Sequence, residues 1–384
     1  MHATRLLLAT LRLSSGAAPE RLRAAWRATP TPGLERLVEF EGCALWLYRR
    51  LAQIGAAGAS GGPFTGWVAR RARDTAARNL LVDTQATDVV RMLTAHDVPH
   101  VLLKGVARRA MAQRLPFVDA RATHDVDLLV PADRAEDAWL RLRANGYQLV
   151  GRDHGIRPGH FHLPPLWNEA RVAVELHTAS GPHVSSEEAW RRATSGGCEL
   201  ERDGVTVRVP AATELLWHGL THAVRHRTDT FRLRVLLDGA AILAAGVELD
   251  WAEIEQRLGT AESAPAAVAR AWLAAAAELA GAPLPARLRP GPARFDLVRA
   301  LRWRCSVLRL LPPSAHLASV LAGEGWRLEL GQEWGYPHRR ASPLRHSVQR
   351  LRAAAARGAY RLWRAADAPP AADGDWAGSR FFGN

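Results

Sequence analysis

Hydrophobic residues recur at a helical period through most of the first 96 positions. The residues at this spacing between positions 66 and 96 are Leu80, Leu81, Val89, Val90 and Leu93. This pattern predicts a long amphipathic helix over residues 66–96. Apolar stretches separated by Pro19, Pro30 and Pro32 predict shorter helices over residues 1–60. We therefore expect a helical N-terminal region over residues 1–96.

The hydrophobic period shortens between residues 97 and 210. His100–Leu103 is an apolar run between Pro99 and Gly105, and it predicts a buried strand. Further strands, and a hairpin with an Asp-Gly turn, are predicted over residues 125–130, 147–150, 171–177 and 199–209. Helical patterns occupy residues 106–114 and 132–145. This mixture predicts an α/β core over residues 97–210.

The helical period returns after Pro210. Helices are expected over residues 211–226, 231–246, 251–258, 265–280, 293–311 and 342–364. They make up a helical C-terminal region over residues 211–366. Residues 367–384 are rich in Pro, Ala and Gly and are expected to form a mobile tail. The predicted fold class is therefore α+β, with a mixed-sheet core and helical flanking regions.

Composition is that of a globular protein and argues against a membrane protein. Apolar residues make up 48% of the chain, but no run reaches the ~18–20 consecutive apolar residues that a membrane helix needs. Arg12 interrupts the apolar stretch near the start and no convincing cleavage site follows, so no signal peptide is expected. Cys43, Cys198 and Cys305 lie far apart, which argues against a disulfide framework and favours a reducing cytoplasm.

The charge balance is strongly basic, with a formal net charge of +13. Such a charge favours polyanionic partners such as nucleotides, nucleic acid or acidic lipid. The same excess could instead be spread over solvated helix faces. The basic amphipathic segment Arg339–Arg364 leaves the same two interpretations open, an anionic partner (RNA or a membrane surface) or the solvated face of a packed helix.

One lysine, Lys104, stands among 51 basic residues. An abundance of Arg, Ala and Gly is typical of a GC-rich genome, in which lysine codons drift to arginine. A surface position accepts that exchange easily, whereas a site that needs a compact ammonium does not, because a guanidinium is wider and planar. Lys104 is therefore a candidate for a chemical requirement.

Three features of the α/β core could act together. Leu103-Lys104-Gly105 lies where a strand turns into a helix, and such a turn can bring backbone N–H groups close to a phosphate. Asp125 and Asp127 are two apart on a strand, so they share one face and repel each other unless a cation lies between them. Glu175 lies between apolar residues of another strand and needs a partner. A shared Mg²⁺ would satisfy all three carboxylates.

These segments resemble a known family. In order, VLLKG, RATHDVDLLV, VAVELH, ELLWHGLTHAVRH and RLRVLLDGAAIL are similar to segments of a bacterial group of uncharacterised nucleotidyltransferases, within the DNA polymerase beta-like superfamily. The resemblance covers roughly residues 75–285. Gly105-Val106 stands where the wider superfamily has Gly-Ser, so a hydroxyl for the phosphate is missing and Lys104 is expected to replace it.

The resemblance implies a nucleotidyltransferase fold and a set of roles. Asp125, Asp127 and Glu175 would hold two Mg²⁺ (or Mn²⁺) ions, and Glu175 could instead act as a general base, its pKa raised by the other carboxylates. Lys104, Gly105 and Arg121 would bind the triphosphate of an NTP. The implied reaction transfers a nucleoside monophosphate to a hydroxyl of an unknown acceptor, which is a small molecule, a peptide, a protein or RNA, and releases pyrophosphate.

Two other functions stay open at this point. One is a non-catalytic or antitoxin-like module that binds a nucleotide without turnover and regulates a partner protein. The other is an RNA-modifying enzyme that adds nucleotides to an RNA end. Transfer of label to RNA, or binding without transfer, would distinguish them.

Several histidines and one further acid lie near these segments. His218, His222 and His226 share one helix face, which indicates a polar face near the cleft, a contact to substrate or phosphate, or a zinc site. His177 shares a strand face with Glu175 and could orient a metal ligand. Asp238 is expected to pair with Arg232 or Arg234 of the same segment.

Overall fold

The computed structural model describes residues 3–13, 18–28, 31, 33–57, 62–115, 117–150, 161–180, 184–225, 232–259 and 264–289. All of them belong to one compact unit. The helices predicted over 293–311 and 342–364, the tail over 367–384, the segment Arg339–Arg364 and His226 lie outside the described residues. The division of the chain after residues 96, 210 and 366 stays a prediction.

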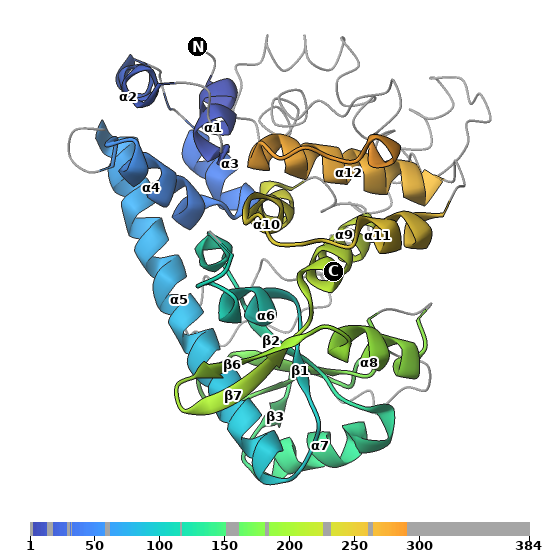
Figure 1. Cartoon of the computed structure of the whole chain (residues 1–384). Helices are drawn as coiled ribbons and strands as arrows, with labels where there is room; N and C mark the ends of the chain where they lie inside the picture. The colour runs from blue at the N-terminus through green and yellow to red at the C-terminus, as the bar shows by residue number, and fades with distance from the viewer. Residues whose placement is uncertain are drawn as a thin grey trace, which may run out of the picture. The chain divides into compact units, whose positions relative to one another are not determined.

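The N-terminal residues form helices, as the apolar spacing predicted. They are α1 (Ala3–Leu11), α2 (Pro19–Ala28), α3 (Leu34–Glu41), α4 (Ala44–Gln53) and α5 (Gly62–Ala95). The long helix α5 packs against α4 and also reaches strand β2 (Asp125–Leu129) of the core. It therefore connects the N-terminal helices to the part of the fold that carries the candidate site (Figure 1).

The buried face of α5 differs from the predicted one near its middle. Leu80 and Leu81 are 66% and 48% exposed, whereas Asn79 and Asp83 are buried. These polar residues can take core positions because each has partners. The Asn79 amide donates to the carbonyls of Asp119 and Arg121, and the Asp83 carboxylate accepts from Arg109. Hydrogen-bonded polar residues thus replace leucines in the buried stripe of this helix.

A five-stranded mixed sheet forms the centre of the core, in agreement with the predicted fold class. Its order is β1 (Val101–Leu102), β2, β5 (Ala173–His177), β4 (Leu166–Trp167) and β3 (Gln148–Leu149). Strands β2 and β5 are parallel, and the other neighbours are antiparallel. The register of β2 and β5 pairs Asp127 with Glu175. Strand β4 was not predicted.

The remaining core elements surround this sheet. Helices α7 (Ala132–Ala144) and α8 (Ser186–Thr194) follow β2 and β5 in the chain, and β6 (Cys198–Arg202) and β7 (Val205–Val209) form the predicted hairpin. Its turn residues Asp203 and Gly204 both have positive φ, which a type I′ hairpin turn requires. Strand β7 packs against β1 and α5.

The helices after residue 210 reach the core through α6 (Lys104–Ala110). They are α9 (Ala212–Arg225), α10 (Leu233–Ala244), α11 (Trp251–Leu258) and α12 (Ala264–Ala280). Helix α6 begins two residues earlier than predicted and contacts both β2 and α9, while α10 packs against α9 and α12 (Figure 1). Side chains of α9 and α10 can therefore meet those of β2 and α6. Within the described residues, no helix combines the length and apolarity needed to cross a bilayer.

Candidate active site

Lys104 and Gly105 form the turn between β1 and α6, as the sequence predicted. Lys104 is the first residue of α6 and has a φ of 47°, an uncommon conformation for a residue with a side chain. Gly105 is required by close packing. A Cβ atom there would lie 2.7 Å from Thr123 Cγ2 and 3.2 Å from an Arg121 Nη atom. The glycine therefore makes room for the segment that leads into β2.

The structure brings Asp127 and Glu175 together across two neighbouring strands. Asp127 is 1% exposed, and the Glu175 side chain is 23% exposed. The Lys104 ammonium lies 2.5 Å from Asp127 Oδ1 and 3.7 Å from Glu175 Oε2. His177 Nε2 lies 2.8 Å from the same Asp127 oxygen and 3.4 Å from the same Glu175 oxygen. Two carboxylates and two cationic side chains thus meet at one point of the sheet.

His177 is closer to this centre than the sequence indicated. In the described part of the chain, Asp127, Glu175 and His177 form a group whose ligand atoms all lie within 4.8 Å of one another. Asp125 is not in that group, but it lines the same pocket as Asp127. The predicted metal set of Asp125, Asp127 and Glu175 stays a prediction, with His177 as an additional candidate ligand. The feature of the sequence that indicated His177 was its two-residue spacing from Glu175, which places both on one strand face.

The electrostatics of the three carboxylates differ. Burial raises the pKa of Asp125 to about 6, and the charge of Asp127 adds to the effect. Burial alone would also raise the pKa of Asp127, but Lys104 and His177 outweigh it and hold that pKa well below its usual range. The pKa of Glu175 is lowered as well, because the His177 hydrogen bond and the Lys104 charge outweigh burial and Asp127. The expected rise in the pKa of Glu175 is therefore wrong.

The donor set fits a divalent cation. The neighbouring carboxylates raise the pKa values of Lys104 and His177 against the effect of burial. The Lys104 ammonium between Asp127 and Glu175 marks a position at which positive charge is favourable. Carboxylate oxygens suit Mg²⁺ and Mn²⁺, and an imidazole nitrogen is a ligand that Mn²⁺ and zinc also accept.

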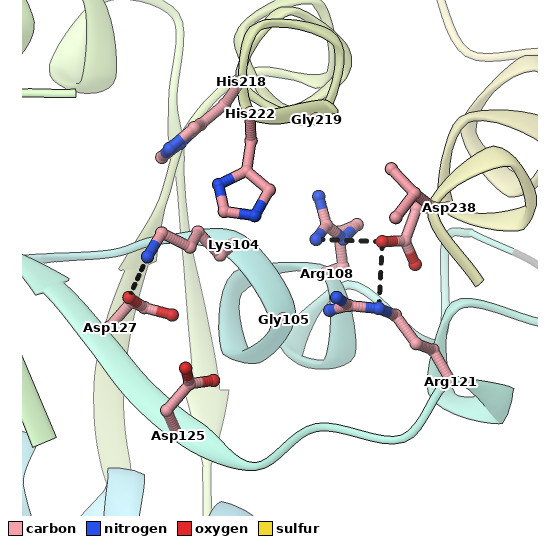
Figure 2. A pocket seen from close by; sticks show the side chains of 11 residues that line it. Lys104, Gly105, Arg108, Arg121, Asp125, Asp127, His218, Gly219, His222 and Asp238 are labelled. Atoms are coloured by element: carbon pink, nitrogen blue, oxygen red, sulfur yellow. Dashed lines mark hydrogen bonds and ion pairs between the residues drawn. The ribbon is translucent and has the colours of Figure 1, made fainter. Parts of the chain in front are cut away.

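A pocket lies in front of these residues, between the core and the later helices. It encloses about 490 Å³ of space, part of it open to solvent. The core contributes Lys104, Gly105, Arg108, Arg121, Asp125 and Asp127, and helices α9 and α10 contribute His218, Gly219, His222, Val235 and Asp238. Figure 2 shows these side chains converging from the strand and from the helices.

Two charged residues of this pocket were not assigned to the site from the sequence. Asp238 Oδ2 lies 3.1 Å from Arg108 Nη2 and 3.1 Å from Arg121 Nε (Figure 2). The sequence predicted a pairing of Asp238 with Arg232 or Arg234 and did not predict these contacts with Arg108 and Arg121 of the core. Nothing in the sequence distinguished Arg108 from the other arginines, of which the chain has 50. Asp238 was distinguishable, because it is a single acidic residue within an apolar helical segment.

The two described histidines of α9 face the pocket, as their shared helix face predicted. His218 is buried, and burial together with Lys104 and His177 lowers its pKa to about 3, so its imidazole is neutral. Neither His218 nor His222 belongs to the metal-competent group found in the described residues. A polar wall of the pocket is therefore the best description of this helix face.

Comparisons with known proteins agree with this arrangement. The family described as "Uncharacterised nucleotidyltransferase" matches residues 32–277. No curated protein matches the sequence. The solution structure of the antibiotic-resistance factor ANT(2'')-Ia is 12% identical, with a TM-score of 0.33, over 50% of this chain and 91% of that one.

An antigenic nucleotidyltransferase-like protein from Paracoccidioides brasiliensis is 16% identical, also with a TM-score of 0.33, over 53% of this chain and 93% of that one. At such scores neither structure adds to the assignment, which depends on the family match over most of the described residues. The chain belongs to the family of uncharacterised nucleotidyltransferases.

Proposed function

We propose that this protein is a metal-dependent nucleotidyltransferase, which moves a nucleoside monophosphate from an NTP to a hydroxyl of an acceptor. The observation that carries the proposal is the meeting of Asp127 and Glu175, on adjacent parallel strands, with Lys104 at the same point. Asp125 faces the same pocket from β2.

Asp125, Asp127 and Glu175 would hold Mg²⁺ or Mn²⁺, with His177 able to contribute a nitrogen once its imidazole has lost a proton. When bound, the metal supplies positive charge that neutralises phosphate oxygens. The ammonium of Lys104 and the guanidinium of Arg121 line the pocket and would bind the triphosphate. His177 contacts both Asp127 and Glu175 and would fix the orientation of their carboxylates.

The transfer is an in-line displacement at the α-phosphorus. The acceptor oxygen forms a bond to this phosphorus, the bond to the β-phosphate oxygen breaks, and pyrophosphate leaves. The proton of the acceptor hydroxyl passes to a carboxylate.

The test is a labelling experiment with the full chain. Purified protein is incubated with Mg²⁺, a lysate and each α-³²P-labelled NTP in turn, and the label on acceptors and the release of pyrophosphate are measured. Replacement of both Asp125 and Asp127 by Asn should abolish transfer. The matched control is Asp133→Asn, which removes a carboxylate from an exposed position in the first turn of α7 and should keep full activity.

One observation favours a second candidate, a nucleotide-binding module without turnover. Lys104 and His177 neutralise Asp127 and Glu175 from within the protein, so these carboxylates have cationic partners without a metal. If NTP binds but no label moves with any lysate fraction, this module is the correct function. Label on RNA alone would identify an RNA-end nucleotide-adding enzyme, and label on another molecule would identify the acceptor class.

A further inference from the structure

The cluster of Arg108, Arg121 and Asp238 lies in the pocket but has no role in holding a metal. Arg108 belongs to α6, Arg121 to the segment before β2, and Asp238 to α10. Arg108 and Asp238 are 5% and 4% exposed, and both guanidinium groups contact the same oxygen, Oδ2 of Asp238, at 3.1 Å. Figure 2 shows the acid between the two arginines.

This cluster contains more hydrogen-bond donors than Asp238 satisfies. The Nε atom of Arg108 is buried and has no hydrogen-bond acceptor, and the same holds for the Thr123 hydroxyl. Arg121 Nε is also buried, and its contact with Asp238 Oδ2 at 3.1 Å does not have the geometry of a hydrogen bond. Thr123 lies against Gly105, which lines the pocket. Native proteins rarely leave buried donors without an acceptor, because the lost hydration is not compensated. Two such donors beside a third that is poorly paired indicate that an acceptor is missing.

The charges of the cluster indicate the same kind of ligand. Two guanidinium groups face one carboxylate, so a net positive charge remains. Arg108 is buried, and burial lowers its pKa although the neighbouring Asp238 favours the charged form. Planar guanidinium groups match the oxygens of a phosphate, which accepts several hydrogen bonds at once.

We propose that Arg108 and Arg121 form a subsite for a phosphate-type oxyanion, and that the Asp238 carboxylate occupies it until that anion binds. The source is the triphosphate of the donor nucleotide, so this assignment rests on the proposed function. Arg108 thereby becomes a substrate-binding residue. Asp238 is an internal competitor, and it connects occupancy of the subsite to the position of α10.

The test compares anion binding by the full chain and its variants in calorimetry, with inorganic tripolyphosphate as the probe. Asp238→Asn keeps the shape of the side chain but removes the competing charge. It should raise the affinity at least about tenfold, because hydrogen bonds to charged groups contribute roughly 1.5–3 kcal/mol each. Arg108→Gln should lower the affinity by a similar factor.

Glu214→Gln is the matched control. Glu214 forms a similarly buried ion pair with Arg257, and it does not line the pocket. This variant changes the net charge of the protein by the same amount, so it should leave the affinity unchanged. An affinity in Asp238→Asn that is equal to or below that of the wild type, in folded protein, overturns the proposal. If Asp238→Asn does not fold, undiminished binding by Arg108→Gln overturns it instead.

A second titration identifies the source of the anion. With an NTP and Ca²⁺ saturating the protein, inorganic phosphate should no longer bind to Asp238→Asn if the triphosphate fills the subsite. Binding of phosphate under these conditions would overturn the donor assignment and give the subsite to an anionic acceptor. These readouts measure binding alone, so failure of nucleotidyl transfer and failure of the subsite are separate results.

Discussion

Replacement of Gly105 by Ala tests the tight contact at the turn before the carboxylates. The new Cβ would lie 2.7 Å from Thr123 Cγ2, 3.1 Å from Thr123 Oγ1 and 3.2 Å from an Arg121 Nη atom. Thr123 cannot withdraw easily, because it is 2% exposed and its backbone N–H donates to Asn79 Oδ1 at 2.9 Å. We expect Thr123 and Arg121 to be displaced from the pocket.

Two effects of opposite sign determine the change in the free energy of unfolding. Forcing an extra methyl into a packed site costs typically 1–3 kcal/mol. Alanine is favoured over glycine in a helix by up to about 1 kcal/mol, and Gly105 is the second residue of α6. Because the contact distance is well below van der Waals contact, the steric cost outweighs the gain. We expect a net loss of stability of about 1–2 kcal/mol.

The measurement is urea unfolding, with tripolyphosphate affinity as a second readout. Gly66→Ala is the matched control, since Gly66 lies in helix α5 and its nearest neighbour would be an Arg70 Nη atom at 3.9 Å. This control should gain stability by up to about 1 kcal/mol and leave binding unchanged. If Gly105→Ala is as stable as the wild type and binds the anion equally well, the steric account of this glycine is refuted.

Two further predictions concern the charges around the metal position. Lys104→Arg should reduce transfer at least about tenfold, because a planar guanidinium cannot replace an ammonium that lies 2.5 Å from Asp127 and 3.4 Å from His177; undiminished activity would disprove the requirement for lysine. Mn²⁺ affinity, measured by electron paramagnetic resonance, should fall as the pH drops through about 6. Asp125, whose pKa is about 6, becomes protonated there, while Asp127 and Glu175, with lowered pKa values, stay ionised. Asp125→Asn should remove this step, and a step that persists in the variant would contradict the assignment.

The sequence identified the parts of the site that depend on local geometry. Side chains two apart on a strand share a face, so the spacing of Asp125 and Asp127 was sufficient to place both on one side of β2. The change of period at residue 97 marked the start of the core, and a short run before a glycine located Lys104 at the turn. These features follow from the pleat of a strand and the pitch of a helix, which are the same in every fold.

The sequence did not reveal which distant residues would meet. The register of β2 and β5 determines that Asp127 lies opposite Glu175, and it draws His177 into the same group. Asp238 contacts Arg108 and Arg121 of the core because α10 packs against α9 and α9 packs against α6. Asn79 and Asp83 are buried where the hydrophobic period predicted leucines. The sequence could not show this, because the hydrogen-bond partners of Asn79 and Asp83 belong to other elements.

The amino-acid sequence by itself determined the family, the kinds of element and the residue types that could bind a metal and a triphosphate. The tertiary structure decided the ion-pair partners, the pKa of each carboxylate and the contribution of the later helices to the pocket. The physical reason is the distance along the chain over which each effect acts. Backbone periodicity acts over a few residues, whereas burial and charge pairing depend on atoms that only packing brings together.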